Sequence, residues 1–81
     1  PFNPTTDISF TLNKESEVTL TIFNMLGQQV KELTSGLKQA GNYTLRWNGS
    51  DNMGARVSSG IYLYTLDNGT QSITKKMVLM K

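Results

Sequence analysis

The side chains that could do chemistry are few, and their types restrict which reactions this chain could perform. With no histidine and no cysteine, the sequence lacks the commonest general base, and thiolate chemistry is excluded. A carboxylate pair could hydrolyse a glycosidic bond if a cleft held the two groups about 5–10 Å apart. The six carboxylates fall instead at expected turns and outward strand positions, namely Asp7, Glu15, Glu17, Glu32, Asp51 and Asp67. We therefore predict that the protein is not an enzyme.

One loop resembles a metal site in its spacing. Its polar residues follow part of the calcium-loop pattern D-x-[DN]-x-[DN]-G, at Asn48, Ser50, Asn52 and Gly54. The first ligand is Asn rather than Asp, and position twelve is Ser59, which cannot supply the bidentate carboxylate. A glycine-rich turn explains the spacing better, and we expect no metal and no other cofactor.

Length and charge limit the remaining classes of function. A chain of 81 residues suits one domain, which we place at 1–81, with 1–5 as the end of an upstream linker. The chain begins at Pro1 without a methionine, which suggests a fragment or a processed protein. Its net charge is +2, and only Lys75, Lys76 and Lys81 cluster, so no nucleic-acid partner is expected. No apolar run approaches the ~20 residues that span a bilayer.

Alternation of apolar and polar residues dominates the sequence and predicts half-buried strands. The clearest alternating sets are Ile8, Phe10 and Leu12, then Val18, Leu20 and Ile22, then Tyr43, Leu45 and Trp47. No window gives a convincing helical repeat. Turn residues between the runs favour an all-β fold, an immunoglobulin-like antiparallel β-sandwich of six to seven strands with no disulfide. Trp47 is expected to anchor its core, because the usual cysteine pair is absent.

Two details of the strand arrangement can also be predicted. Asn68-Gly69 favours a two-residue type I′ turn between the last two strands. That register would place Tyr62 opposite Lys75, so we expect a bulge, or else a lysine that reaches out at the sheet margin. Residues 28–34 are expected to form a short, irregular edge strand, because Val30 and Leu33 are three residues apart.

Several short motifs form an ordered set that covers nearly the whole chain. They are Pro1-Phe2-Asn3-Pro4-Thr5-Thr6, residues 18–27, Trp47-Asn48-Gly49, Ser59-Gly60-Ile61-Tyr62-Leu63-Tyr64, and Lys75-Lys76-Met77-Val78-Leu79 with Lys81. Together they resemble the type A C-terminal sorting domain of the type IX secretion system. The immunoglobulin-like domain of the flagellar hook-capping protein is similar over the stretch from Trp-Asn-Gly to Gly-Ile-Tyr. It is not expected to end in a Lys-Lys-Met-Val-Leu segment.

The resemblance implies a non-catalytic sorting signal that directs a cargo protein across the bacterial outer membrane for cell-surface attachment. Its partners would be an outer-membrane translocon and a sortase, and its location would be extracellular or at the cell surface, reached through the periplasm. Recognition would then involve Gly60, Ile61, Tyr62, Lys75, Lys76, Met77, Val78, Leu79 and Lys81. An exposed final strand could be recognised by strand addition.

Two further functions fit the same composition. The chain could be a structural subunit that self-associates through the edge strands of its sheets, giving a filament if the contact is head-to-tail. Carbohydrate binding would instead require an exposed row of aromatic side chains. We expect most aromatic residues to fill the core, because they lie in phase with aliphatic neighbours, and we therefore predict no small-molecule substrate.

Overall fold

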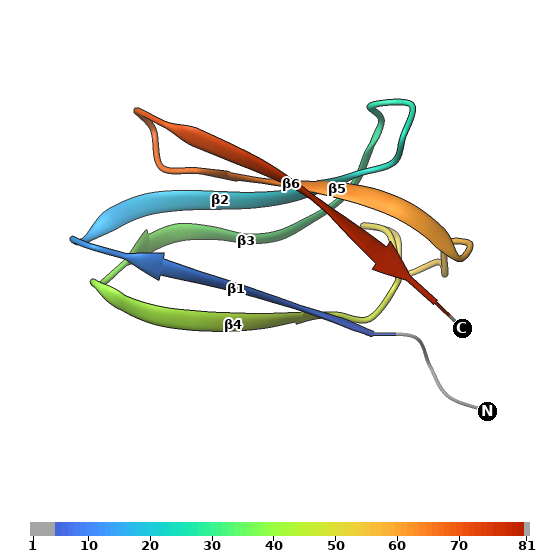
Figure 1. Cartoon of the computed structure of the whole chain (residues 1–81), viewed down its shortest axis with the longest axis horizontal. Coiled ribbons are helices and arrows are strands. Elements are labelled where there is room, and N and C mark those ends of the chain that lie inside the picture. The colour runs from blue at the N-terminus through green and yellow to red at the C-terminus, as the bar shows by residue number, and fades with distance from the viewer. Residues whose placement is uncertain (1–4, 81) are drawn as a thin grey trace.

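Six antiparallel strands account for the regular structure of residues 5–80, the part of the chain described by this computed structural model (Figure 1). They are β1 (Thr6–Leu12), β2 (Ser16–Phe23), β3 (Gln29–Lys38), β4 (Gly41–Trp47), β5 (Gly60–Asp67) and β6 (Ser72–Leu79). Side chains alternate between the two faces of a strand, so the alternating apolar residues bury one face of each. The all-β prediction is confirmed. None of the described segments is a helix able to span a membrane.

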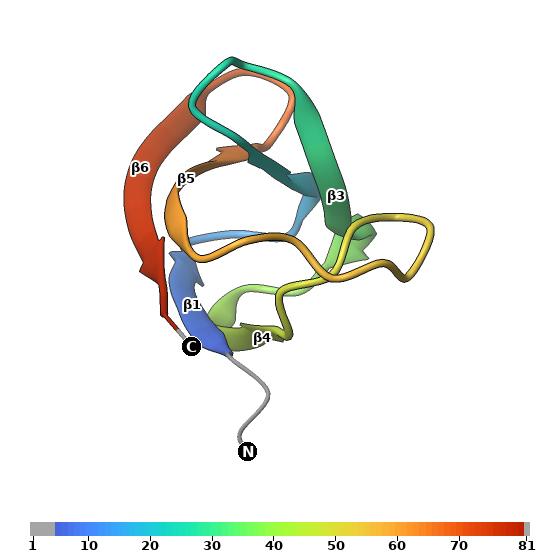
Figure 2. The ribbon, with the colours of Figure 1, turned by 90° about the vertical axis from the view of Figure 1, so that its right-hand side faces the viewer.

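The strands form two layers that pack face to face. β1 pairs with β4 in the smaller sheet, where Ile8 lies opposite Leu45. The larger sheet has the strand order β3-β2-β5-β6. Viewed along the strands, β6 and β3 lie on opposite sides of the molecule, and β6 approaches β1 (Figure 2). β1 and β6 are thus the edge strands of two different sheets on the same side.

The core is concentrated toward one end of the sandwich. Its largest fully buried side chain is Trp47, whose indole Nε1 donates to the carbonyl of Ser50 at 2.9 Å. Tyr62 meets the indole edge-to-face at a centroid distance of 5.1 Å. The other buried members of this cluster are Ile8, Leu20, Ile22, Val30, Met77 and Leu79. The prediction that Trp47 anchors the core is confirmed.

The edge strand β3 is irregular, as predicted, but longer than the expected 28–34. Its register with β2 shifts twice, and the paired positions pass over Leu33 and then Val30. An extra residue in one strand changes which side chains face inward. The two bulges therefore allow Val30 to be buried and Leu33 to pack against the core, although they are three residues apart.

The prediction of a two-residue type I′ turn at Asn68-Gly69 is wrong. Asp67 pairs with Ser72, so residues 68–71 form a longer loop, and Asn68 does not have the positive φ that type I′ requires. Asn68 Oδ1 instead accepts hydrogen bonds from the backbone N–H groups of Thr70 and Gln71. The two added loop residues shift the register so that Tyr62 faces Met77, with no bulge in the β5–β6 pairing.

The longer loop also settles where Lys75 lies. It pairs with Tyr64 on the inward side of β6, yet it remains exposed at the margin of the sheet. The expected bulge is therefore wrong, and the alternative, a lysine that reaches out at the sheet margin, is the arrangement found. In the loop between β4 and β5, an isolated antiparallel bridge joins Ser50 and Arg56.

Candidate docking surfaces

The structure brings most of the predicted recognition residues together. The start of β5 pairs with the end of β6, so that Gly60 lies opposite Leu79 and Ile61 lies opposite Val78. Lys76 continues the same edge strand toward the loop at residues 68–71. Lys81, the last predicted recognition residue, lies outside the described residues. The two segments form one two-stranded surface, although they are far apart in the sequence.

The two faces of this surface differ in what they can offer a partner. Tyr62, Met77 and Leu79 point inward and are buried, so they maintain the fold rather than contact another molecule. Ile61 and Val78 point outward and are exposed. A partner that docks here would therefore meet the outward pair and the neighbouring lysine Lys76.

Two tyrosines tie loops to strands by the same kind of hydrogen bond. Tyr62 Oη donates to the carbonyl of Ser58 at 2.7 Å, and Tyr43 Oη donates to the carbonyl of Gln39 at 2.6 Å. Each acceptor lies four residues before its tyrosine, and the Tyr62 bond is the more buried one. The predicted recognition residue Tyr62 therefore has a structural role that its sequence position alone did not indicate.

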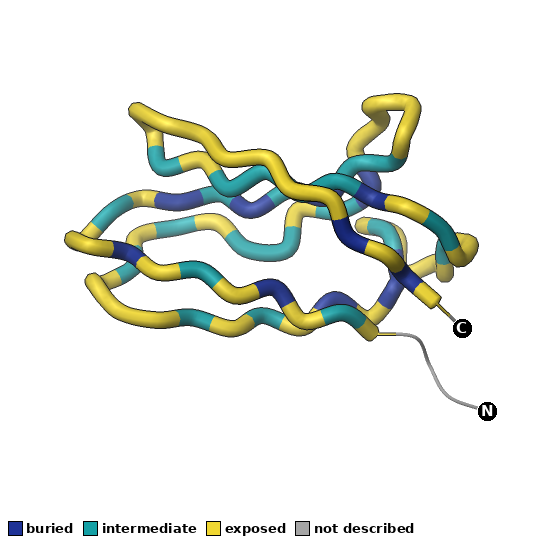
Figure 3. Tube along the Cα trace, in the orientation of Figure 1, coloured by how far each residue is buried: buried dark blue, intermediate teal, exposed yellow. Residues whose placement is uncertain are grey.

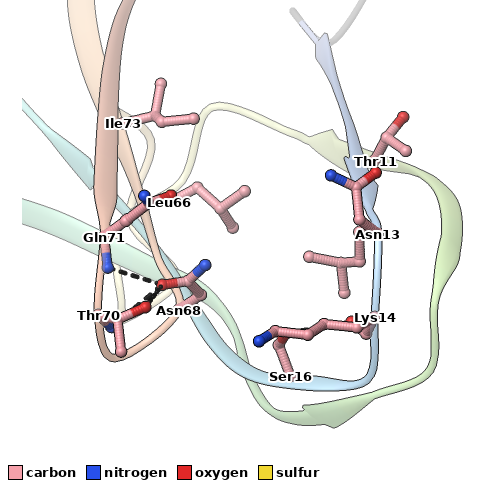
Figure 4. A pocket seen from close by; sticks show the side chains of 10 residues that line it. Thr11, Asn13, Lys14, Ser16, Leu66, Asn68, Thr70, Gln71 and Ile73 are labelled. Carbon is pink, nitrogen blue, oxygen red and sulfur yellow. Dashed lines mark hydrogen bonds between the residues drawn. The ribbon is translucent and has the colours of Figure 1, made fainter.

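Sequence reasoning missed a hollow at the end of the sandwich opposite Trp47. It has a volume of about 430 Å³ and is lined by residues of the β1–β2 turn and the β5–β6 loop (Figure 4). A smaller hollow of about 160 Å³ continues it along β1 and β6, and both are lined by Thr11, Leu66 and Ile73. We call the combined feature the β1–β6 groove. It was missed because its walls come from both sheets, and their separation cannot be inferred from strand periodicity.

The carboxylates do not gather into a metal-binding group. Within residues 5–80, no three acidic side chains are close enough together to hold a metal ion. Asp51 Oδ1 instead accepts hydrogen bonds from the backbone N–H groups of Met53 and Ala55 and so closes the loop that resembles a calcium site. That loop also covers β3, because Asn52 N–H donates to the carbonyl of Val30 at 3.1 Å.

The one ion pair in the described part of the chain links the two strands of the smaller sheet at its surface. Arg46 Nε donates to Asp7 Oδ1 at 2.9 Å. This hydrogen bond, with the attraction of the guanidinium, lowers the pKa of the Asp7 carboxyl and raises the pKa of Arg46. Both side chains are at least half exposed, so solvent screens the interaction. The pair supports the β1–β4 register, in which Asp7 lies opposite Arg46.

Comparison with solved structures confirms the immunoglobulin-like sandwich. FlgD from P. aeruginosa matches with a TM-score of 0.72 and 22% identity, over 93% of this chain and 59% of that protein. FlgD from Xanthomonas campestris matches with a TM-score of 0.72 and 23% identity. Its crystal structure is presented as giving insights into the hook capping that is essential for flagellar assembly. That match covers 95% of this chain and 56% of the other. The chain therefore spans just over half the length of these proteins. No curated protein sequence matches it.

A family model gives the decisive result and overturns the predicted sorting function. The model of the FlgD Ig-like domain matches residues 2–72, and neither this match nor the structural neighbours show a type IX sorting domain. The motifs shared by the two families include Trp47 and Tyr62, which the structure places in the core and which therefore identify the fold rather than the function. The prediction gave too much weight to residues 75–81, which lie beyond the matched range. The chain belongs to the family of FlgD Ig-like domains.

Proposed function

We propose that this chain is a non-catalytic structural module that docks to other protein subunits during assembly of a flagellar hook. The observation that supports this most strongly is the match to the FlgD Ig-like domain over residues 2–72. The structure from Xanthomonas campestris is described in terms of hook capping, and the present chain shares its fold. The translocon and sortase are not part of this proposal.

The surface chemistry supports docking rather than catalysis. The described carboxylates form no group that could hold a metal ion, and Asp51 and Asp67 each accept backbone hydrogen bonds in a turn. The two sheets meanwhile present edge strands, whose free backbone groups are able to pair with another chain. An extracellular place of action stays part of the proposal. It can be checked by whether added protease reaches an epitope tag on intact cells.

A domain replacement tests this function in a working assembly. The Ig-like domain of a FlgD protein is replaced by this chain, and hooks are counted by electron microscopy. We expect hooks to form in the chimera but not in a matched chimera that carries an unrelated immunoglobulin-like domain. A chimera that is folded and produced at normal levels, yet forms no hooks, would contradict the proposal.

The predicted self-association through edge strands needs a separate test on the isolated chain. Sedimentation velocity over a hundredfold range of concentration reports whether the chain forms dimers or longer species. A concentration-dependent increase in sedimentation coefficient would support a self-associating subunit. A constant monomer value would show that docking requires a different protein.

A further inference from the structure

The inward face of β6 is exposed along the first half of the strand and buried toward its end. Met77 and Leu79 are 8% and 0% exposed, whereas Ile73 is 55% exposed on the same face. Lys75 lies between them on that face and is exposed too. Figure 3 shows the change along β6, where the first half is exposed and buried positions occur only near the end. Ile73 is therefore an apolar side chain on the inward face that the opposite layer leaves largely uncovered.

The strand that could cover Ile73 is β1, but β1 diverges from β6. The two strands are joined where Thr6 Oγ1 donates to the carbonyl of Val78 at 3.2 Å, near the beginning of β1 and the end of β6. Farther along, they separate and leave the β1–β6 groove (Figures 1 and 2). Its apolar wall is formed by Phe10, Leu66 and Ile73, beside Tyr64.

The backbone of β6 is arranged to pair with an added strand along this groove. Because the carbonyl of Val78 accepts a hydrogen bond from Thr6, it points away from β5. Successive residues of an antiparallel strand direct their N–H and C=O groups to alternate sides. The backbone groups of Lys76 and Thr74 therefore point toward the same edge, beside the groove.

The opposite edge of the larger sheet is less accessible. There Asn52 N–H donates to the carbonyl of Val30, and the backbone N–H of Glu32 donates to Asn52 Oδ1, both at 3.1 Å. The loop thus covers the bulged part of β3. Backbone pairing with a partner is therefore favoured at β6.

The charge of the groove indicates the chemistry of its occupant. Its lining includes two lysines, Lys14 and Lys75, and none of the described lining residues is acidic. A second copy of the chain that paired β6 with β6 in an antiparallel register centred on Lys75 would place lysine opposite lysine, which is unfavourable. A carboxylate opposite Lys75 would be favourable, and an apolar side chain opposite Ile73 would cover it.

We propose that the β1–β6 groove binds an extended segment of another protein, which adds as a strand to β6. On its inner face this segment carries an apolar residue opposite Ile73 and a carboxylate two positions along, opposite Lys75. Main-chain hydrogen bonds to Thr74 and Lys76 supply affinity, and the inward side chains supply specificity. The inference rests on the proposed function, because it names the surface through which the module docks.

Peptide titration of the isotopically labelled full chain, followed by NMR, tests the proposal. The probe is an eight-residue extended peptide in which Val and Glu occupy alternate inner-face positions, and its control has Lys in place of Glu. We expect the shifts to be largest at Ile73, Thr74, Lys76 and Leu66, and the Glu peptide to bind about tenfold more tightly. Equal binding of both peptides, or shifts confined to other surfaces, would overturn the proposal.

Two variants and one modified peptide test the separate contributions. Lys75→Glu should weaken binding of the Glu peptide about tenfold and improve binding of the Lys peptide, whereas Lys31→Glu, on β3, should change neither. Thr74→Pro removes an edge N–H at a position where an edge strand tolerates proline. N-methylation of the peptide amides that face β6 removes hydrogen-bond donors from the peptide instead, and leaves the protein unaltered. Both changes should abolish binding, and unchanged affinity would contradict strand addition.

The tests separate this inference from the proposed function. If no peptide binds at millimolar concentration while the FlgD chimera still forms hooks, the groove proposal fails and the assembly role stands. If peptides bind as expected while the chimera forms no hooks, the groove is supported and the assembly role fails. Concentration-dependent dimerisation with shifts in the groove would identify a second copy as the occupant and overturn the proposal.

Discussion

The two ends of the sandwich differ in how the space between the two sheets is filled. At the end near Trp47, aromatic and aliphatic side chains fill the space between the layers, and the indole N–H is hydrogen-bonded. At the end near residues 68–71, Leu12 and Val18 are buried, but the layers separate around the β1–β6 groove, whose lining includes Asn13 and Gln71. Stability is therefore concentrated at the closed end, whereas the open end retains surface for a partner. The comparison shows that one strand, β6, contributes buried side chains to the packed end and exposed side chains to the surface at the open end.

The largest effect should come from truncating matched side chains on the same face of β6. Leu79→Ala should cost about 2–5 kcal/mol of unfolding free energy, because it leaves a cavity in the packed end. Ile73→Ala should cost less than about 1 kcal/mol, since Ile73 is exposed at the open end. Urea unfolding measures both variants. Equal losses would show that the open end is as well packed as the closed end.

A smaller difference is expected between the two tyrosine hydrogen bonds. Tyr62→Phe removes the more buried bond to the carbonyl of Ser58 and should cost about 1 kcal/mol. Tyr43→Phe removes the exposed bond to the carbonyl of Gln39, which water can replace, and should cost less. Thermal unfolding of the two single variants checks the order. A greater loss for Tyr43→Phe would place more stability in the smaller sheet than the burial pattern indicates.

Turn variants should show that the difference between the ends lies in packing rather than in the loops. Asn24 Oδ1 accepts from the N–H groups of Leu26 and Gln28, and Asn68 Oδ1 makes similar bonds in the β5–β6 loop. Asn24→Ala and Asn68→Ala should therefore each cost a similar amount, roughly 0.5–1.5 kcal/mol. Chemical denaturation of both variants measures this. A large difference between them would mean that one loop carries stability of its own.

The smallest effect should follow from the surface pair Asp7–Arg46. The pKa of Asp7 is lower in the folded chain than in the unfolded chain, so its contribution is complete above the unfolded value of about 3.9. The contribution is lost as the pH falls through the lower folded pKa. Unfolding curves of the wild type and Asp7→Asn between pH 6 and pH 2 should converge toward the acid end. Parallel curves would show that the pair is fully screened.

Strand positions could be predicted because each buried strand repeats a two-residue pattern, as Val18, Leu20 and Ile22 show. The length of the loop at residues 68–71 could not be predicted. An Asn-Gly pair is typical of a tight two-residue turn, but here the side chain of Asn68 stabilises a longer loop through its hydrogen bonds to the backbone of Thr70 and Gln71. The β1–β6 groove was inaccessible to sequence reasoning, since it depends on how far two sheets diverge. The function was mistaken because the most recognisable motifs, around Trp47 and Tyr62, serve the core.

The hydrogen bond from Thr6 to Val78 also marks where tension between the first and last strands would act. It places the beginning of the first strand beside the end of the last, so a pull on these two points acts at one end of the molecule. Thr6 is opposite Trp47 at the start of the β1–β4 ladder, so force reaches the ladder bonds one after another instead of all together. Such a peeling geometry yields at low force. The fold is thus poorly arranged to bear load between these two points.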